Sequence, residues 1–262
     1  MKLNEDFEKT ITSESVEEWR YPRFFSGNAD DSTVVIDGTD AANISRVLRM
    51  RKGDLAVVCD CRGNDLLCRI TSASDKLVEL DIIGRKPSAG EPDIRLRLFQ
   101  CLPKSDKMDF IVQKAVELGA AEVIPVISKR CVSRPDAAGA DKKRIRWQRI
   151  AEEAAKQCGR GIIPQVGAAV SFEEAVRSFD SGKSTGIFFY ECGGKKLNDI
   201  IGKEKHDNID IFIGSEGGFE REEAQLAENA GITAATLGTR ILRCETAPIA
   251  AISVLMNLTN NM

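Results

Sequence analysis

The sequence lacks several of the patterns by which common enzyme classes and membrane proteins are recognised. Its only histidine, His206, lies in the polar stretch EKHDN with no evident nucleophile beside it. A hydrolase built on a Ser–His or Cys–His pair is therefore not expected, and His206 is predicted to lie at the surface. No run of about 18 apolar residues occurs, so no membrane span is predicted.

Cysteine patterns that bind metals or form disulfide frameworks are also missing. The eight cysteines include no C-x-x-C pair, and the nearest approach to a cluster, Cys59, Cys61 and Cys68, matches no zinc spacing. We expect these cysteines in or beside strands as small apolar side chains, without disulfides and without a metal. The stretch 1–19 is polar and lacks the apolar segment of a secretory signal, which indicates a cytoplasmic protein.

Two phosphate-binding motifs are absent as well. The G-x-G-x-x-G fingerprint of dinucleotide-binding folds does not occur. The segment SGKST (181–185) resembles the end of a P-loop, but Arg177 stands where that motif requires a glycine. A strand pattern also follows the segment where a P-loop requires a helix. We therefore reject a nucleoside triphosphate site here.

The first part of the chain is predicted to be a small β-barrel. From residue 21 to about 86, short apolar or alternating runs are separated by Gly, Asp and Ser. One helix is predicted at 40–50, with Ile44, Val47 and Leu48 on one face.

A linker and a second domain are predicted to follow. The stretch KPSAGEPD (86–93), rich in proline and glycine, indicates the linker. Strand and helix patterns alternate after it, which predicts an α/β domain with a largely parallel sheet. We expect a barrel domain at 1–88, with a polar tail at 1–19, and the α/β domain at 92–262.

Charge is unevenly distributed in the second domain. Between Lys129 and Arg160, basic residues outnumber acidic ones, although the whole chain has a net charge of −3. Much of this charge falls on a helix predicted to begin after Asp141, its expected N-cap, with an apolar stripe around Trp147 and Ala151. A basic face suits a polyanionic partner, and a plain solvated helix face is the alternative.

Two glycine-bearing loops follow strand patterns near the C-terminus. GSEGGF (214–219) comes after the strand pattern IDIFI, and LGTRILRCETA (237–247) comes after ITAAT. Open α/β sheets bind ligands at the carboxyl ends of their strands, and glycine lets the backbone approach a ligand closely. The two loops therefore predict one composite site, although a plain strand-to-helix turn remains the alternative for the first loop.

The charges of the second loop point to the substrate. Glu245 and Thr246 suit the first turn of the apolar helix predicted at 246–258. Arg240 and Arg243 do not, because cations are disfavoured at a helix N-terminus. Their placement indicates a substrate that carries or develops negative charge.

Six sequence blocks occur in a characteristic order: YPRFF (21–25), NISRVLRMRKGD (43–54), KSDKMDFIVQKAVELGAAEVIPVIS (104–128), RWQRIAEEAAKQCGR (146–160), IGSEGGF (213–219) and LGTRILRCETA (237–247). With these blocks the chain resembles the RsmE family, bacterial 16S ribosomal RNA uridine N3-methyltransferases of the SPOUT superfamily. The resemblance covers residues 21 to 262 and departs from the family pattern at Ser215, where proline is usual, and at Asn43, where histidine is usual.

The resemblance implies a fold, a cofactor and partners. The fold would be a PUA-like β-barrel followed by a SPOUT-type parallel-sheet domain with a trefoil knot. The last helix would pack against a second subunit in a homodimer, and the substrate would be 16S ribosomal RNA or the small ribosomal subunit. S-adenosylmethionine would be bound by Gly214, Ser215, Glu216, Gly217, Gly218, Leu237, Gly238, Ile241, Leu242, Arg243, Thr246 and Ala247.

The resemblance also implies roles in methyl transfer to a ring nitrogen. Glu245 or Glu216 would be the general base, and Arg243 or Arg240 would stabilise the developing anion, without a metal. The alternatives are a SPOUT enzyme that methylates another base or a ribose hydroxyl, and a non-catalytic RNA-binding assembly protein. RNA contacts are expected from Arg23, Arg49, Arg51, Lys104, Arg130, Arg144 and Arg160.

Overall fold

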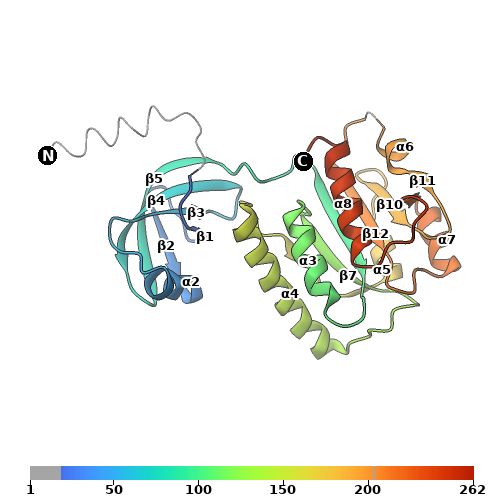
Figure 1. Cartoon of the computed structure of the whole chain (residues 1–262), viewed down its shortest axis with the longest axis horizontal. Coiled ribbons are helices and arrows are strands. Elements are labelled where there is room, and N and C mark those ends of the chain that lie inside the picture. Colours follow the sequence, from blue (N-terminus) through green and yellow to red (C-terminus); the bar gives the residue numbers. More distant parts are fainter. Residues whose placement is uncertain (1–18, 203) are drawn as a thin grey trace. The chain divides into compact units, whose positions relative to one another are not determined.

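The computed structural model of the protein describes residues 19–202 and 204–262, so nearly all of the predicted polar tail lies outside the described residues. The chain divides into two compact units, Met1–Pro87 and Ser88–Met262 (Figure 1). This boundary falls within the stretch 86–93 that the sequence marks as a linker. In the part of the chain that the structure describes, no helix is both long and apolar enough to span a membrane.

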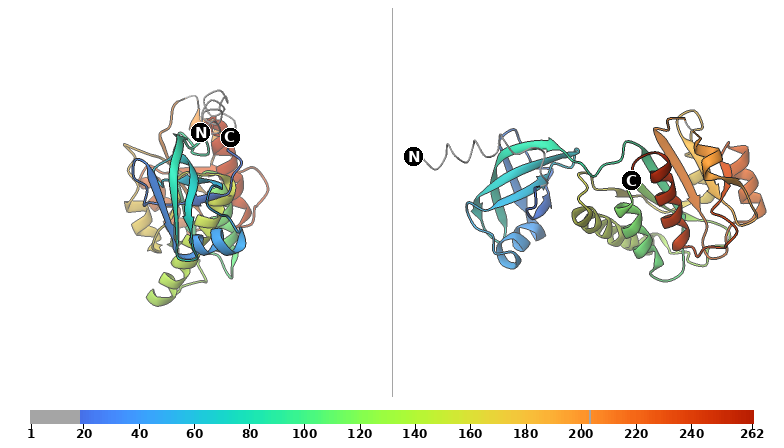
Figure 2. Two further views of the ribbon diagram at one scale, coloured as in Figure 1. Left: turned by 90° about the vertical axis from the view of Figure 1, so that its left-hand side faces the viewer. Right: turned by 45° about the horizontal axis from the view of Figure 1, so that its top comes forward.

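A curled five-stranded sheet forms the first unit (Figure 2), in the order β1-β3-β4-β5-β2. Its strands β1 to β5 are Arg23–Phe25, Thr33–Asp37, Leu55–Cys59, Asn64–Ala73 and Leu77–Pro87. Register shifts in the β4–β5 pair, at Leu67/Cys68 and Ile70/Ser72, allow these long strands to bend. The sheet curls around an apolar core that includes Phe24 and Val34. The predicted barrel is thus confirmed as a half-barrel.

The predicted helix at 40–50 is shorter and wider than its sequence pattern suggests. Helix α2 spans Gly38–Ala42 and continues as a π-helical turn, η1, over Asn43–Val47. The wider turn is closed by the Leu48 amide, which donates to the Asn43 carbonyl at 2.9 Å. Of the three residues expected to share a buried face, only Ile44 is buried, whereas Val47 is 72% exposed and Leu48 is 45% exposed. The period of 3.6 residues fails here because the turn is π-helical.

The second unit contains a sheet whose neighbouring strands are all parallel, as predicted. Along the main sheet the strand order is β11-β13-β10-β12-β6-β7-β8, and β9 also pairs with β7. The strands β6 to β13 are Arg95–Cys101, Glu122–Ile127, Gln165–Val166, Val170–Ser171, Thr185–Phe189, Lys195–Lys196, Asn208–Ile213 and Thr233–Thr236. The α/β class is confirmed, and the trefoil knot stays a prediction.

Helices of the second unit pack in two groups. Helix α3 contacts α4 and α8, and α8 also contacts α6, whereas α5 contacts α7 (Figure 1). The helices α3 to α8 are Lys107–Glu117, Ala137–Cys158, Phe172–Arg177, Leu197–Ile201, Arg221–Asn229 and Thr246–Leu258. Helix α5 begins with a capping box formed by Ser171 and Glu174.

The basic helix begins earlier than predicted. Its N-cap is Asp136, which accepts a hydrogen bond from the Gly139 amide at 2.9 Å, so Asp141 lies inside the helix rather than at its start. The predicted apolar stripe is confirmed at Trp147 and Ala151, which are both buried. The first turn was missed because it carries no apolar stripe, and only the cap marks it.

His206 has a structural role rather than a surface one. Its Nδ1 lies 2.8 Å from the Thr185 hydroxyl and its Nε2 lies 2.8 Å from the Ile201 carbonyl oxygen. The half-buried ring thus connects β10 with the end of α6. Cys59 and Cys68 are buried in strands as expected, whereas Cys61 is exposed in a turn.

Candidate functional site

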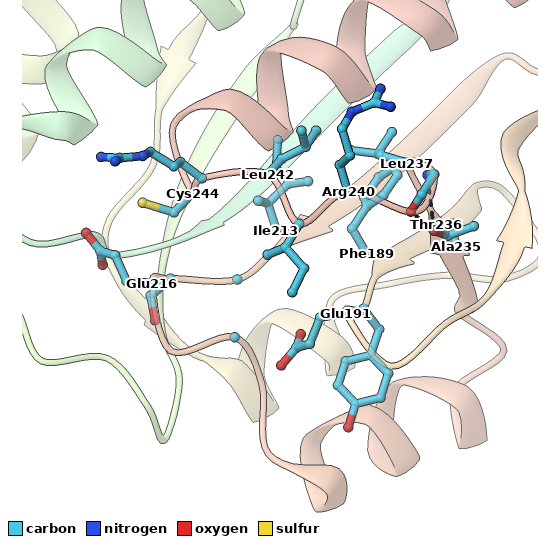
Figure 3. A pocket seen from close by; sticks show the side chains of 18 of the residues that line it. Phe189, Glu191, Ile213, Glu216, Ala235, Thr236, Leu237, Arg240, Leu242 and Cys244 are labelled. Atoms are coloured by element: carbon cyan, nitrogen blue, oxygen red, sulfur yellow. Dashed lines mark hydrogen bonds between the residues drawn. The ribbon is translucent and has the colours of Figure 1, made fainter.

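A cavity of about 600 Å³ opens where three neighbouring parallel strands end. Strands β13, β10 and β12 are adjacent in the sheet, and the segments that follow them line the cavity (Figure 3). Phe189, Ile213, Leu237 and Leu242 form an apolar centre, and Glu191 and Glu216 lie toward the edges (Figure 3). We call this space the strand-end cavity. Its size and its mainly apolar walls with a few polar groups are typical of small-molecule sites.

The loop at 214–219 is a tight turn that requires glycine. Gly218 has a φ of +66°, and its amide donates to the Ser215 carbonyl at 3.0 Å. A Cβ atom at Gly218 would lie 2.3 Å from Oε1 of Glu191. The turn closes although Ser215 replaces the proline usual in the resembled family. Phe219 anchors the far end of the loop, because its buried ring lies 4.4 Å from that of Phe188.

The loop at 237–247 turns at Gly238, which has a φ of +105°. The Thr236 hydroxyl donates to the Gly238 carbonyl at 3.0 Å, which fixes the turn. Arg240 and Arg243 follow, and both are exposed residues that line the cavity. Neither guanidinium has a hydrogen bond or ion pair with any residue that the structure describes. In Figure 3 the Arg240 guanidinium points away from Glu191 and Glu216.

A third loop, after β10, was missed by sequence reasoning. Phe189, Tyr190 and Glu191 line the cavity, and the Tyr190 amide donates to the Ala235 carbonyl at 3.3 Å. The segment ECGG (191–194) carries the same signal as the other two loops, glycines after a buried strand. The sequence could therefore have predicted that this third loop also lines the cavity.

Lys107, at the start of α3, joins the two predicted loops and was also missed. Its Nζ lies 2.9 Å from Glu216 Oε1 and 3.1 Å from Glu245 Oε2. Glu216 also accepts a hydrogen bond from the Lys104 amide at 3.2 Å. The Cys244 thiol donates to Glu245 at 3.1 Å, and burial raises the pKa of this thiol to about 12, so it keeps its proton.

These contacts keep both carboxylates ionised. Desolvation by burial raises the pKa of Glu216, but hydrogen bonds from Lys107 and the Lys104 amide outweigh it, and the net pKa is lowered. The Cys244 hydrogen bond, together with Lys107, lowers the pKa of Glu245. A general base works best with a pKa near the operating pH. A lowered pKa makes each carboxylate a weaker base, and the role of general base for Glu216 or Glu245 stays a prediction.

The structure brings most of the predicted cofactor residues together. Thr246 is the exception, because it is the exposed first residue of α8 and does not line the cavity. The predicted residues that do line it are Gly214, Ser215, Glu216, Gly217, Gly218, Leu237, Gly238, Ile241, Leu242, Arg243 and Ala247. No group of three potential metal ligands occurs among the described residues.

The expected RNA contact of Arg160 is wrong, because the structure buries this residue. It is only 3% exposed, its Nη2 lies 2.7 Å from Glu91 Oε2, and it donates to the carbonyls of Val116 and Ala120. A guanidinium enclosed in this way cannot reach an RNA backbone, so Arg160 is structural.

Three further arginines among the expected RNA contacts are engaged in ion pairs. Arg130 donates to Glu220 and to the Gly217 carbonyl, at 3.0 and 2.9 Å, and so supports the 214–219 loop. Arg23 lies 2.7 Å from Asp65 within the first unit. Arg144 is half-buried, and its Nε lies 3.8 Å from Asp141 Oδ1. The remaining three expected contacts are exposed: Arg49, Arg51 and Lys104.

Comparison with known proteins follows the two-unit division. Residues 90–256 match the family model of an RNA methyltransferase domain, and residues 44–83 match that of an RNA methyltransferase PUA domain. The chain is 35% identical over 230 residues to the ribosomal RNA small subunit methyltransferase E of Bacillus subtilis, a match that covers 85% of this chain and 89% of the relative. The same-named protein of Buchnera aphidicola subsp. Schizaphis graminum is 31% identical over 81% of this chain and 85% of its own length.

A solved structure agrees with these relatives. The crystal structure of a ribosomal RNA small subunit methyltransferase E from Neisseria gonorrhoeae, bound to S-adenosyl methionine, superposes with a TM-score of 0.81. It is 34% identical in sequence, and the match covers 91% of this chain and 98% of that one.

Proposed function

Because the chain belongs to the RNA methyltransferase family that includes the ribosomal RNA small subunit methyltransferases E, we propose that it methylates N3 of a uridine in 16S ribosomal RNA. S-adenosylmethionine is the proposed methyl donor. The observation that carries the proposal is the strand-end cavity, in which two glycine turns and an apolar centre lie beside Arg240 and Arg243, which have no ion-pair partner among the described residues. We place this activity in the cytoplasm.

The residues present fit S-adenosylmethionine. The apolar side chains of Phe189, Ile213, Leu237 and Leu242 suit an adenine ring, and the Glu191 carboxylate suits a cationic ligand. The glycines at 214–218 let backbone groups approach the ligand closely. When bound, this cofactor supplies an electrophilic methyl group on a sulfonium sulfur.

The charged residues of the cavity set the chemistry on the uracil. Uridine N3 carries a proton, so negative charge must develop on the ring and its two oxygens before N3 can act as a nucleophile. The guanidinium of Arg243, which lines the cavity, would stabilise that charge. Because Lys107 is paired with Glu216 and Glu245, we infer that the N3 proton passes to a solvent water molecule, and that the cations favour this transfer by stabilising the N3 anion.

Recognition of the RNA would use the exposed basic residues. N3 lies on the Watson–Crick edge, so the target uridine must be unpaired or turned out of its stack. Arg49 and Arg51 are exposed, and the half-buried Arg144 keeps 41% of its side chain exposed beside Asp141. All three are suited to contact the phosphate backbone, which predicts salt-dependent affinity.

Methyl transfer is the first test of this function. The purified protein is expected to transfer labelled methyl groups from S-adenosylmethionine to small-subunit ribosomal RNA taken from cells that lack the protein. Large-subunit RNA from the same cells is the control substrate and should stay unlabelled. RNA binding without cofactor affinity or label transfer would instead indicate a non-catalytic assembly protein.

We also propose a homodimer built on α8. This helix is apolar along most of its length, yet Val254 is 40% exposed. Analytical ultracentrifugation at micromolar concentration is expected to show a dimer, and Val254→Glu should shift it toward the monomer, since a buried unpaired charge is unfavourable. A wild-type protein that sediments as a monomer would contradict the dimer.

A further inference from the structure

Lys107 occupies a position that its own helix disfavours. It is the first residue of α3, and a cation in the first helical turn is opposed by the helix dipole. Its ammonium group nevertheless lines the strand-end cavity. Such a placement requires compensation from outside the helix, and two carboxylates provide it.

The two carboxylates come from different loops, and only Glu216 lines the cavity. Glu216 belongs to the loop after β12, and Glu245 immediately precedes α8 at the end of the loop after β13. Both lie within 3.1 Å of the Lys107 Nζ. The exposed fractions of the side chains are 31% for Lys107, 30% for Glu216 and 21% for Glu245. These partly buried charges are screened less by water and salt than a surface pair would be.

We propose that Lys107 is a positioning residue for methyl transfer, because its ammonium group holds the loops that carry Glu216 and Glu245 in the arrangement that binds the cofactor. The inference rests on the proposed function. Without Lys107, the two like charges that now share its ammonium group would lie close together with no cation between them. Their repulsion would separate the loops even though neither loop had lost a side chain of its own.

The first experiment measures S-adenosylmethionine affinity by calorimetry. Lys107→Met is expected to weaken binding on the order of tenfold, within the usual range of coupling energies between contacting charges. Lys107→Arg keeps the positive charge and should recover most of the affinity. Lys114→Met is the matched control, because Lys114 lies on the same helix, is also ion-paired, with Glu117 at 2.7 Å, and does not line the cavity.

A second set of variants separates positioning from a general loss of stability. In the Lys107→Met background, adding Glu216→Gln and Glu245→Gln removes the repulsion and is expected to restore part of the lost affinity. If Lys107 only stabilised the fold, the losses of affinity caused by the separate substitutions would instead add together. Additive losses, or an affinity unchanged by Lys107→Met, would overturn the positioning role.

Hydrogen exchange of the cofactor-free protein tests the same idea without any ligand. Lys107→Met should accelerate amide exchange in both 214–218 and 239–246, whereas Lys114→Met should accelerate neither. If the wild type bound no S-adenosylmethionine but these loops still loosened together, the proposed function would fail and the link made by Lys107 would stand. If the exchange of both loops stayed unchanged, the link itself would be refuted.

Discussion

Replacing Gly218 by valine is expected to abolish measurable binding of S-adenosylmethionine while leaving the overall secondary structure intact. Gly218 has a φ of +66°, where a β-branched residue is strongly disfavoured. A Cβ there would also lie 2.3 Å from the Glu191 carboxylate, which forms part of the cavity wall. Backbone strain of this kind costs on the order of 1–3 kcal/mol, and the turn can relieve it only by opening. Calorimetry measures the loss of affinity, and circular dichroism verifies the fold.

Gly231→Val is the matched control for this variant. Gly231 also has a positive φ, of +86°, but it does not line the strand-end cavity. The control should lower stability through the same backbone strain and yet bind the cofactor normally. A folded Gly218→Val protein with wild-type affinity would show that the 214–219 loop is not part of the cofactor site.

Replacing Arg243 by alanine is expected to slow methyl transfer about a hundredfold, with little change in cofactor affinity. Removing one preorganised donor to a developing anion typically costs on the order of 3 kcal/mol. Arg243 is exposed at the cavity and has no partner among the described residues, so its loss should disturb the fold little. Single-turnover methylation at saturating RNA measures the rate of the chemical step.

The pH dependence distinguishes the possible roles of Arg243. If Arg243 favours the N3 anion, raising the pH should reduce the difference in methylation rate between Arg243→Ala and the wild type. At higher pH more of the N3 anion forms without stabilisation by Arg243. If Arg243 only holds a phosphate, RNA affinity should fall instead, and added salt should weaken wild-type binding in the same way. Arg240→Ala serves as the comparison, since its guanidinium points away from Glu191 and Glu216. An unchanged single-turnover rate for Arg243→Ala would move the catalytic role to Arg240.

Much of the fold could be predicted because the apolar patterns of the second unit match their elements. Runs such as IDIFI became buried parallel strands, and the apolar stripe containing Trp147 became the buried side of α4. Predictions failed where a helix departed from the apolar periodicity of 3.6 residues. The π-helical turn at Asn43–Val47 exposed Val47, and the first turn of α4, made of alanine and glycine without an apolar stripe, gave no sign of the true N-cap, Asp136.

The candidate site was only partly predictable, because its ion pairs join residues far apart in sequence. The glycine loops at 214–219 and 237–247 could be read from their positions after strands. The contacts of Lys107 with Glu216 and Glu245 could not, since they depend on how α3 packs beside those loops. The same holds for Arg160. Its charge predicted a contact with RNA, but in the fold it is buried beside Glu91.

Nucleoside mass spectrometry of small-subunit ribosomal RNA tests the central claim most directly. RNA from cells that lack the protein would be incubated with the purified protein and S-adenosylmethionine, digested and mapped. The account predicts 3-methyluridine at a single position, and its absence when Arg243→Ala protein is used for the same short time. Methylation of a ribose hydroxyl or of another base, or no methylation at all, would contradict it.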